Sequence, residues 1–260
     1  MRRSRGFVAD VMVLAFVVVA AGVAGGRAAA VSAKKGIDPE ADRILKQMTD
    51  YLAGLRSFTV RTSVADELTM KSGEKIQMMS NADIAVERPN RLRSLQYGSP
   101  QGLGFWYDGK MMSVACKANN SYRSAAAPPT IDMVIDMMRK DFDVDAPGAD
   151  LIHSHPYDVL MEQVVGGRFI GRETVDGVPV NHIALQGDEV DLQLWIQDAP
   201  EPLPLRYVIV TKDAPGRPAF SVQLSNWDTK PHLSPSTFEY TATPQAKRGE
   251  AIAASCGRTH

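Results

Sequence analysis

The chain has 260 residues and a formal net charge of −1, with 44% hydrophobic and 23% charged residues. A chain of this length can bury a large core without the help of a metal or a disulfide. Beyond the N-terminus its basic residues form no long run. The composition therefore argues against nucleic acid and anionic membrane surfaces as electrostatic partners.

The first 30 residues have the three parts of a cleavable signal peptide. A positively charged start precedes an apolar stretch, Val11–Ala24, and then Ala28-Ala29-Ala30, which fits an A-x-A cleavage site. The apolar stretch is shorter than the roughly 20 residues that span a bilayer, and no nearby cysteine could carry a lipid anchor. We predict that residues 1–30 are removed on export to the periplasm and that the mature chain is not an integral membrane protein. A second small-residue site, Val31-Ser32-Ala33, leaves the exact cut open.

The two cysteines, Cys116 and Cys256, allow two interpretations. An oxidising compartment permits a disulfide between them. Cys116 could instead be a small buried apolar residue, because Cys256 belongs to residues 244–260, which we expect to form a flexible tail.

Three helices are predicted. Asp38 is a good N-cap and Pro39 suits the first helical position. Apolar residues then recur at spacings of three and four over Ala41–Leu55, which indicates one buried stripe. Thr130 can cap a second helix with an apolar face, and Pro156 opens a short third one.

Between and after the helices, apolar and polar residues alternate with a period of two, as in antiparallel strands with one solvated face. Asp108-Gly109 and Asp176-Gly177 suit type I′ hairpin turns. Residues 118–129 are expected to form a loop. The predicted strands lie within residues 57–64, 76–86, 92–97, 105–107, 110–116, 169–174, 178–185, 190–197, 205–211 and 220–227, with a short last strand near 238–240.

Short turns join neighbouring strands, so the sheet is antiparallel and not built from βαβ units. A sheet of about ten or eleven strands must curl, since large flat sheets are unusual. We therefore predict an α+β fold in a single domain over residues 37–243. Its core is a curved antiparallel half-barrel sheet with the helices packed on the concave face.

Several segments resemble one family of uncharacterised bacterial exported proteins, which is related to the LolA/LolB-like superfamily of periplasmic lipoprotein carriers. These segments are Phe105–Lys110, Pro129–Asp132, Ala149–Ile152, Phe169–Gly171, Val175–Gly177, Val190–Ile196 and Pro202–Arg206. The resemblance implies a half-barrel around an apolar cavity, which in the carriers holds the acyl chains of lipoproteins. Where relatives tend to have Cys-His-His, this chain has Val180-Asn181-His182.

Six residues are candidates for binding an apolar ligand. Methionine adapts to varied apolar shapes, so Met133, Met137 and Met138 on the second helix could cover a cavity, although filling of the core is the alternative. Trp106 and Trp195 could form cavity walls or build the core. Arg206 could meet an anionic head group or point outward from its strand.

Catalytic motifs are absent: the sequence has no G-x-S-x-G, H-E-x-x-H, Walker or C-x-x-C pattern. We therefore predict a binding protein without a cofactor, not an enzyme. It would hold lipid, acyl chains or a lipoprotein in the half-barrel. One alternative is an envelope protein-interaction or stress-sensing module without lipid cargo. The other is a metal-dependent hydrolase that uses His153 and His155 with their acidic neighbours.

Overall fold

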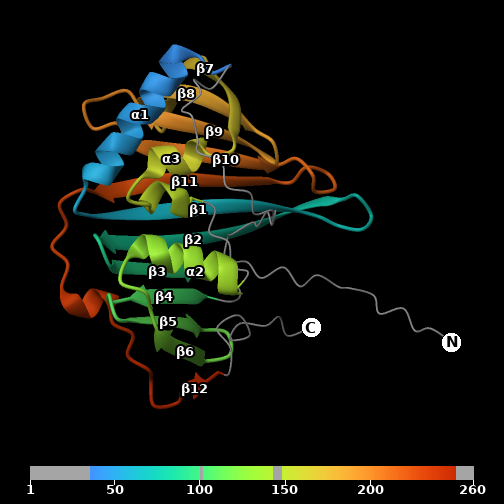
Figure 1. Cartoon of the computed structure of the whole chain (residues 1–260). Helices are drawn as coiled ribbons and strands as arrows, with labels where there is room; N and C mark the ends of the chain where they lie inside the picture. The colour runs from blue at the N-terminus through green and yellow to red at the C-terminus, as the bar shows by residue number, and fades with distance from the viewer. Residues whose placement is uncertain (1–35, 100–101, 143–147, 250–260) are drawn as a thin grey trace, which may run out of the picture.

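The computed structural model describes residues 36–99, 102–142 and 148–249, and its strands form one sheet that is antiparallel except at one edge (Figure 1). The order of its strands is β12-β6-β5-β4-β3-β2-β1-β11-β10-β9-β8-β7. The strands are β1 (Ser57–Thr69), β2 (Lys75–Glu87), β3 (Arg91–Tyr97), β4 (Leu103–Tyr107), β5 (Met111–Cys116), β6 (Ser121–Ala126), β7 (Val164–Val175), β8 (Val178–Gly187), β9 (Val190–Gln197), β10 (Pro204–Thr211), β11 (Ala219–Asp228) and β12 (Lys247–Arg248).

The sheet consists of two meanders that meet at its centre. Strands β1 to β6 form one and β7 to β11 the other, and the antiparallel pairing of β1 with β11 joins them. Strand β12 adds a parallel pair at the β6 edge. This is the predicted curved antiparallel sheet, and its 12 strands slightly exceed the number expected.

The helices lie on one face of the sheet, as predicted (Figure 1). They are α1 (Pro39–Gly54), α2 (Ile131–Phe142), α3 (Pro156–Met161) and the 3-10 helix η1 (Ala149–Ile152). A second 3-10 helix, η2 (Pro235–Phe238), follows β11 at the side of the sheet. Asp38 caps α1 by accepting a hydrogen bond from the Glu40 N–H at 2.9 Å. The same residue ties α1 to the edge strand β7, since its own N–H donates to the Gly167 carbonyl.

Two local predictions were wrong. Residues 118–129 were expected to be a loop, yet Ser121–Ala126 form β6. Its polar sequence lacks alternation, and pairing with β5 over six residues holds it in the sheet. The short strand expected near residues 238–240 is replaced by η2, in which Phe238 is buried.

The C-terminal part of the described chain returns to the β6 edge. The ring of Tyr240 contacts the rings of Trp106 and Tyr122, with centroids 4.8 and 5.2 Å away. Residues 247–248 then pair with β6, so part of the segment expected to be a flexible tail belongs to the sheet. Cys116 is buried and disulfide-bonded. Cys256 and the predicted signal peptide lie outside the described residues.

Candidate functional site

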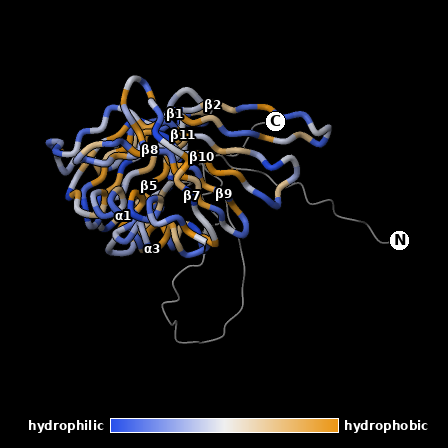
Figure 2. Tube along the Cα trace, turned by 90° about the horizontal axis from the view of Figure 1, so that it is seen from above, coloured by the Kyte–Doolittle hydropathy of each residue, from blue (hydrophilic) through white to orange (hydrophobic). Residues whose placement is uncertain are grey.

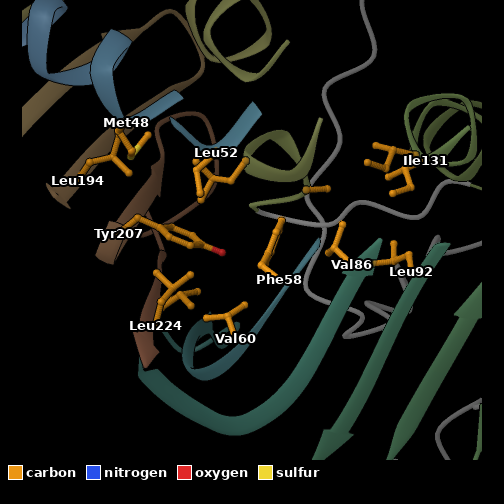
Figure 3. Close-up of a cluster of buried hydrophobic side chains, with 14 of the residues drawn as sticks. Met48, Leu52, Phe58, Val60, Val86, Leu92, Ile131, Leu194, Tyr207 and Leu224 are labelled. Carbon is orange, nitrogen blue, oxygen red and sulfur yellow. The ribbon is translucent and has the colours of Figure 1, made fainter. Parts of the chain in front are cut away.

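The space between the sheet and the helices has a filled half and a hollow half. Helix α1 covers β7 to β10 (Figure 1), and its apolar side chains are buried against the sheet there. Figure 3 shows Met48 of α1 against Leu194 of β9. Leu45, Met48 and Leu194 are at most 1% exposed, and none of them lines the cavity that the described residues form under α2.

The hollow half lies under α2 and η1 and contains a cavity of about 200 Å³. Its floor consists of the concave faces of β1 to β4, β10 and β11. Its cover is the apolar stripe of α2 together with η1 and the end of α1. The apolar side chains of the floor include Phe58, Val60, Ile84, Leu92, Phe105 and Val222, and those of the cover include Leu52, Val134, Ile135, Met138, Leu151 and Ile152.

Strand alternation determines which side chains reach this cavity. In β1 the residues at even positions from Phe58 to Val64 face it, and the cross-strand partners of Val60 and Val64 are Ile84 and Ser80. Figure 3 shows Phe58, Val60 and Leu224 on the inner side of the curved sheet, close to the ring of Tyr207. Burial strongly raises the pKa of the Tyr207 phenol, so this wall is uncharged at any physiological pH.

Polar contacts along α2 and η1 hold the cover in place. The Ile131 N–H donates to the Pro89 carbonyl at 2.9 Å, and the Arg139 guanidinium pairs with Asp150 of η1 at 2.5 Å. The Arg88 guanidinium donates to the Ile152 carbonyl at 2.7 Å. Burial lowers the pKa of Arg88, and the nearby Asp132 opposes that effect. The cover is thus attached through side chains that do not line the cavity.

Of the six residues proposed from the sequence, Met138 alone lines the cavity. It is 4% exposed and belongs to the apolar face of α2. Met137 packs against the edge of the core, and Met133 is 49% exposed.

Trp106, Trp195 and Arg206 lie on the opposite face of the sheet from the cavity. Trp195 stacks on His182 with ring centroids 4.0 Å apart and donates its indole N–H to Glu173 at 2.7 Å. The Arg206 guanidinium lies 5.2 Å from the centre of the Trp195 ring. The hydrogen bonds from Trp195 and then His182 lower the pKa of Glu173. The contacts among Glu173, His182, Trp195 and Arg206 connect the four strands β7 to β10 on the outer face of the sheet. These side chains do not line the cavity.

The alternation that places these three residues outside was present in the sequence. Leu194 and Ile196 flank Trp195, while Phe105 and Tyr107 flank Trp106. Since neighbouring residues of a strand point to opposite faces, each buried flanking pair sends its tryptophan outward. The same rule identifies Phe58, Val60 and Val64 as inner residues that the sequence reading did not select as ligand contacts.

The histidine pair gives no support to a metal site. The His153 ring lies 3.4 Å from Asp132, and the His155 ring contacts the Ser154 hydroxyl at 2.8 Å. Ser154 also binds Asp132 through its N–H and its hydroxyl. Across the described ranges, no group of three His, Cys, Asp or Glu side chains is arranged to hold a metal. These residues connect α2 to the segment before α3.

No helix within the described part of the chain is long and apolar enough to cross a membrane. Among curated proteins, none matches this sequence.

Solved structures with a similar course of the chain include two mycobacterial proteins. Lipoprotein LppX from Mycobacterium tuberculosis is 16% identical, with 76% of this chain and all of that one covered and a TM-score of 0.48. LprF from Mycobacterium bovis is 18% identical over 80% of this chain and 100% of that chain, with a TM-score of 0.44. A LolA superfamily protein from Nitrosomonas europaea is 11% identical over 77% and 97% of the two chains, with a TM-score of 0.39.

The sequence itself gives the stronger finding, since a family match extends over almost the whole described region. The family's description as periplasmic confirms the localisation predicted from the N-terminus. With residues 41–250 matched, the chain belongs to the family described as "Predicted periplasmic protein (DUF2092)".

Proposed function

We propose that this protein is a periplasmic binding protein that holds an apolar chain, such as the acyl chain of a lipid or lipoprotein, in the hollow half of its half-barrel. The observation that carries the proposal is the cavity of about 200 Å³ between α2 and the sheet. Its walls are built almost wholly from aliphatic and aromatic side chains. Apolar cavities with few polar groups are typical sites for small apolar ligands.

An apolar occupant would gain free energy by covering the apolar side chains that line this cavity. Each methylene group that moves from water into apolar surroundings contributes about 0.8 kcal/mol. A short segment of an acyl chain would therefore gain several kcal/mol from burial alone.

The size of the cavity limits what it can hold. Pockets for whole drug-sized ligands measure roughly 300–1,000 Å³, and this one is smaller. It suits one segment of an acyl chain and not a complete lipid. The rest of a longer chain would have to lie outside, along the open side of the half-barrel.

Filling the cavity tests the proposal. Val134 is 1% exposed and lines the cavity from α2, so Val134→Trp should place an indole inside it. We expect a fluorescent fatty-acid probe to bind the variant about tenfold more weakly or worse, because displacing two methylenes already costs that much. Met133→Trp is the matched control, since Met133 is on the solvent side of the same helix. It should bind the probe as the wild type does.

Native mass spectrometry of the protein purified from its own periplasm gives an independent measurement. We expect bound apolar molecules on the wild type and on Met133→Trp, and few on Val134→Trp. If the wild type carries no such molecule and does not bind the probe, the proposed function is wrong. If both tryptophan variants bind equally well, the cavity is not the binding site.

The alternative function is a protein-interaction module without lipid cargo. It is favoured by the exposed apolar side chains Met70, Ile76, Met78 and Met79 on the long β1–β2 hairpin, which projects beyond the body of the molecule (Figure 2). Exposed apolar surface of this kind often marks an interaction site. Under this alternative, substitutions on the hairpin would abolish capture of a periplasmic partner, while Val134→Trp would leave it unchanged.

A further inference from the structure

The carboxylate of Asp66 stands on the concave face of the sheet, beside the residues that line the cavity. Asp66 follows Val64 on the inner side of β1, with Met78 of β2 and Phe220 of β11 as its cross-strand partners. Val64 and Phe220 line the cavity. Asp66 therefore continues the row of inner side chains at the point where the cavity ends and the hairpin begins.

Within the described part of the chain, the Asp66 carboxylate has no hydrogen bond or ion pair. Its neighbour Glu67 faces the other side, where it binds Lys75 at 3.1 Å and accepts the Ala219 N–H. Lys75 of the hairpin is thus already paired with Glu67. Burial, and then repulsion from Glu67, raise the pKa of Asp66. An apolar residue at this position would avoid the free-energy cost of partly burying a charged group.

The inner side chains of β1 and β2 change in character along the strands towards this carboxylate. Phe58, Val60 and Ile84 line the cavity at the far end of the row from Asp66. Thr62 and Ser80 come next, both buried and both lining the cavity. They are followed by Val64 and then by Asp66, which lies opposite the exposed apolar side chain of Met78. An occupant with its apolar end beside Phe58 would pass these hydroxyl groups before it reached the carboxylate.

We propose that Asp66 makes this site selective for apolar chains whose polar end donates hydrogen bonds, above all amines, and selects against chains that end in a carboxylate. The proposal rests on the function proposed above and specifies the ligand class. A donor or cation at the level of Asp66 would give the carboxylate the partner that the described structure does not provide. A second carboxylate at that level would meet like-charge repulsion in a partly desolvated place.

Three ligands with the same alkyl chain separate the effect of the head group from that of apolar burial. They are dodecylamine, dodecanol and dodecanoate, each used below its critical micelle concentration. Their affinities are measured by displacement of a fluorescent acyl probe and by calorimetry. For the wild type we expect the amine to bind about tenfold or more tightly than the carboxylate, with the alcohol between them. In Asp66→Asn, an isosteric change, the amine and the carboxylate should differ by less than about threefold.

Asp83→Asn controls for the change in net charge. Asp83 pairs with Arg61 at 2.8 Å and is exposed, on the outer face of β2. It should keep the wild-type order of affinities. If Asp66→Asn weakens or strengthens all three ligands equally, or if wild-type affinities follow no order of head group, the selectivity proposal is overturned while the binding function stands. If none of the three ligands and no acyl probe binds to the wild type, the binding function itself has failed.

Discussion

Leu45→Ala is expected to lower the free energy of unfolding by about 2–5 kcal/mol, whereas Ile135→Ala should cost roughly half as much. Leu45 of α1 is fully buried in the filled half of the core. Ile135 of α2 is also buried, but it lines the cavity. A side chain beside a void has contact atoms on fewer sides, so its truncation loses less dispersion energy. Urea unfolding followed by circular dichroism measures both changes.

For ligand binding we expect the larger effect from Ile135→Ala and not from Leu45→Ala. Leu45→Ala leaves the cavity lining untouched, so the affinity for an acyl probe should remain that of the wild type. Ile135→Ala widens the cavity, and a larger or branched apolar ligand should gain affinity. Equal losses of stability for the two variants, at unchanged m-values, would contradict the division of the core into a filled and a hollow half.

That division could not be predicted from the sequence, although much of the fold could. The apolar stripe of α1 and the alternation in β1 and β2 are local patterns, and each predicted its element well. The stripes of α1 and α2 look alike in sequence, with apolar residues three and four apart. What differs is that the stripe of α2 lines a cavity, and contacts outside the stripe, such as Arg139 with Asp150 and Ile131 with Pro89, hold α2 there.

Site residues were missed for two different physical reasons. The size of Trp195 suggests a contact with the ligand, but the alternation of its strand places it on the outer face with Gln193, opposite to Leu194. In that case the sequence pattern alone is enough to show that Trp195 does not face the cavity. Asp66 lies beyond the clearly alternating part of β1, where Ala65, Asp66 and Glu67 give no apolar period. Only the register with Met78 and Phe220 shows that its side chain is on the concave face.

Asp66→Asn also has an expected effect on stability. An acid whose pKa is raised in the folded state is destabilising when ionised, and this cost disappears as the pH falls through the folded-state pKa. At neutral pH the substitution should therefore stabilise the fold slightly, by less than about 1 kcal/mol because the carboxylate is partly solvated. Comparing urea midpoints of variant and wild type at neutral and acidic pH tests this: the difference should shrink at the acidic pH.

Gly148→Ala should produce one of the largest losses of stability for so small a change. Gly148 precedes η1 with φ +90°, where a side chain costs roughly 1–2 kcal/mol. A Cβ there would also lie 2.2 Å from the Tyr207 phenol oxygen. Because Tyr207 is buried in the cavity wall, its ring cannot yield without disturbing its neighbours. We expect a total loss of about 3 kcal/mol or more, together with weaker binding of the acyl probe.

Gly73→Ala separates the cost of backbone strain from the cost of the clash with Tyr207. Gly73, in the turn of the β1–β2 hairpin, has a similar φ of +85°, and nothing lies within 4 Å of an added Cβ. Its substitution should cost only the backbone strain, about 1–2 kcal/mol, and leave probe binding unchanged. A double-mutant cycle with Tyr207→Phe completes the test. Because the closest clash is with the phenol oxygen, Gly148→Ala should cost less in the Tyr207→Phe background. A cost that is the same in both backgrounds would show that the strain at Gly148 and the position of Tyr207 are independent.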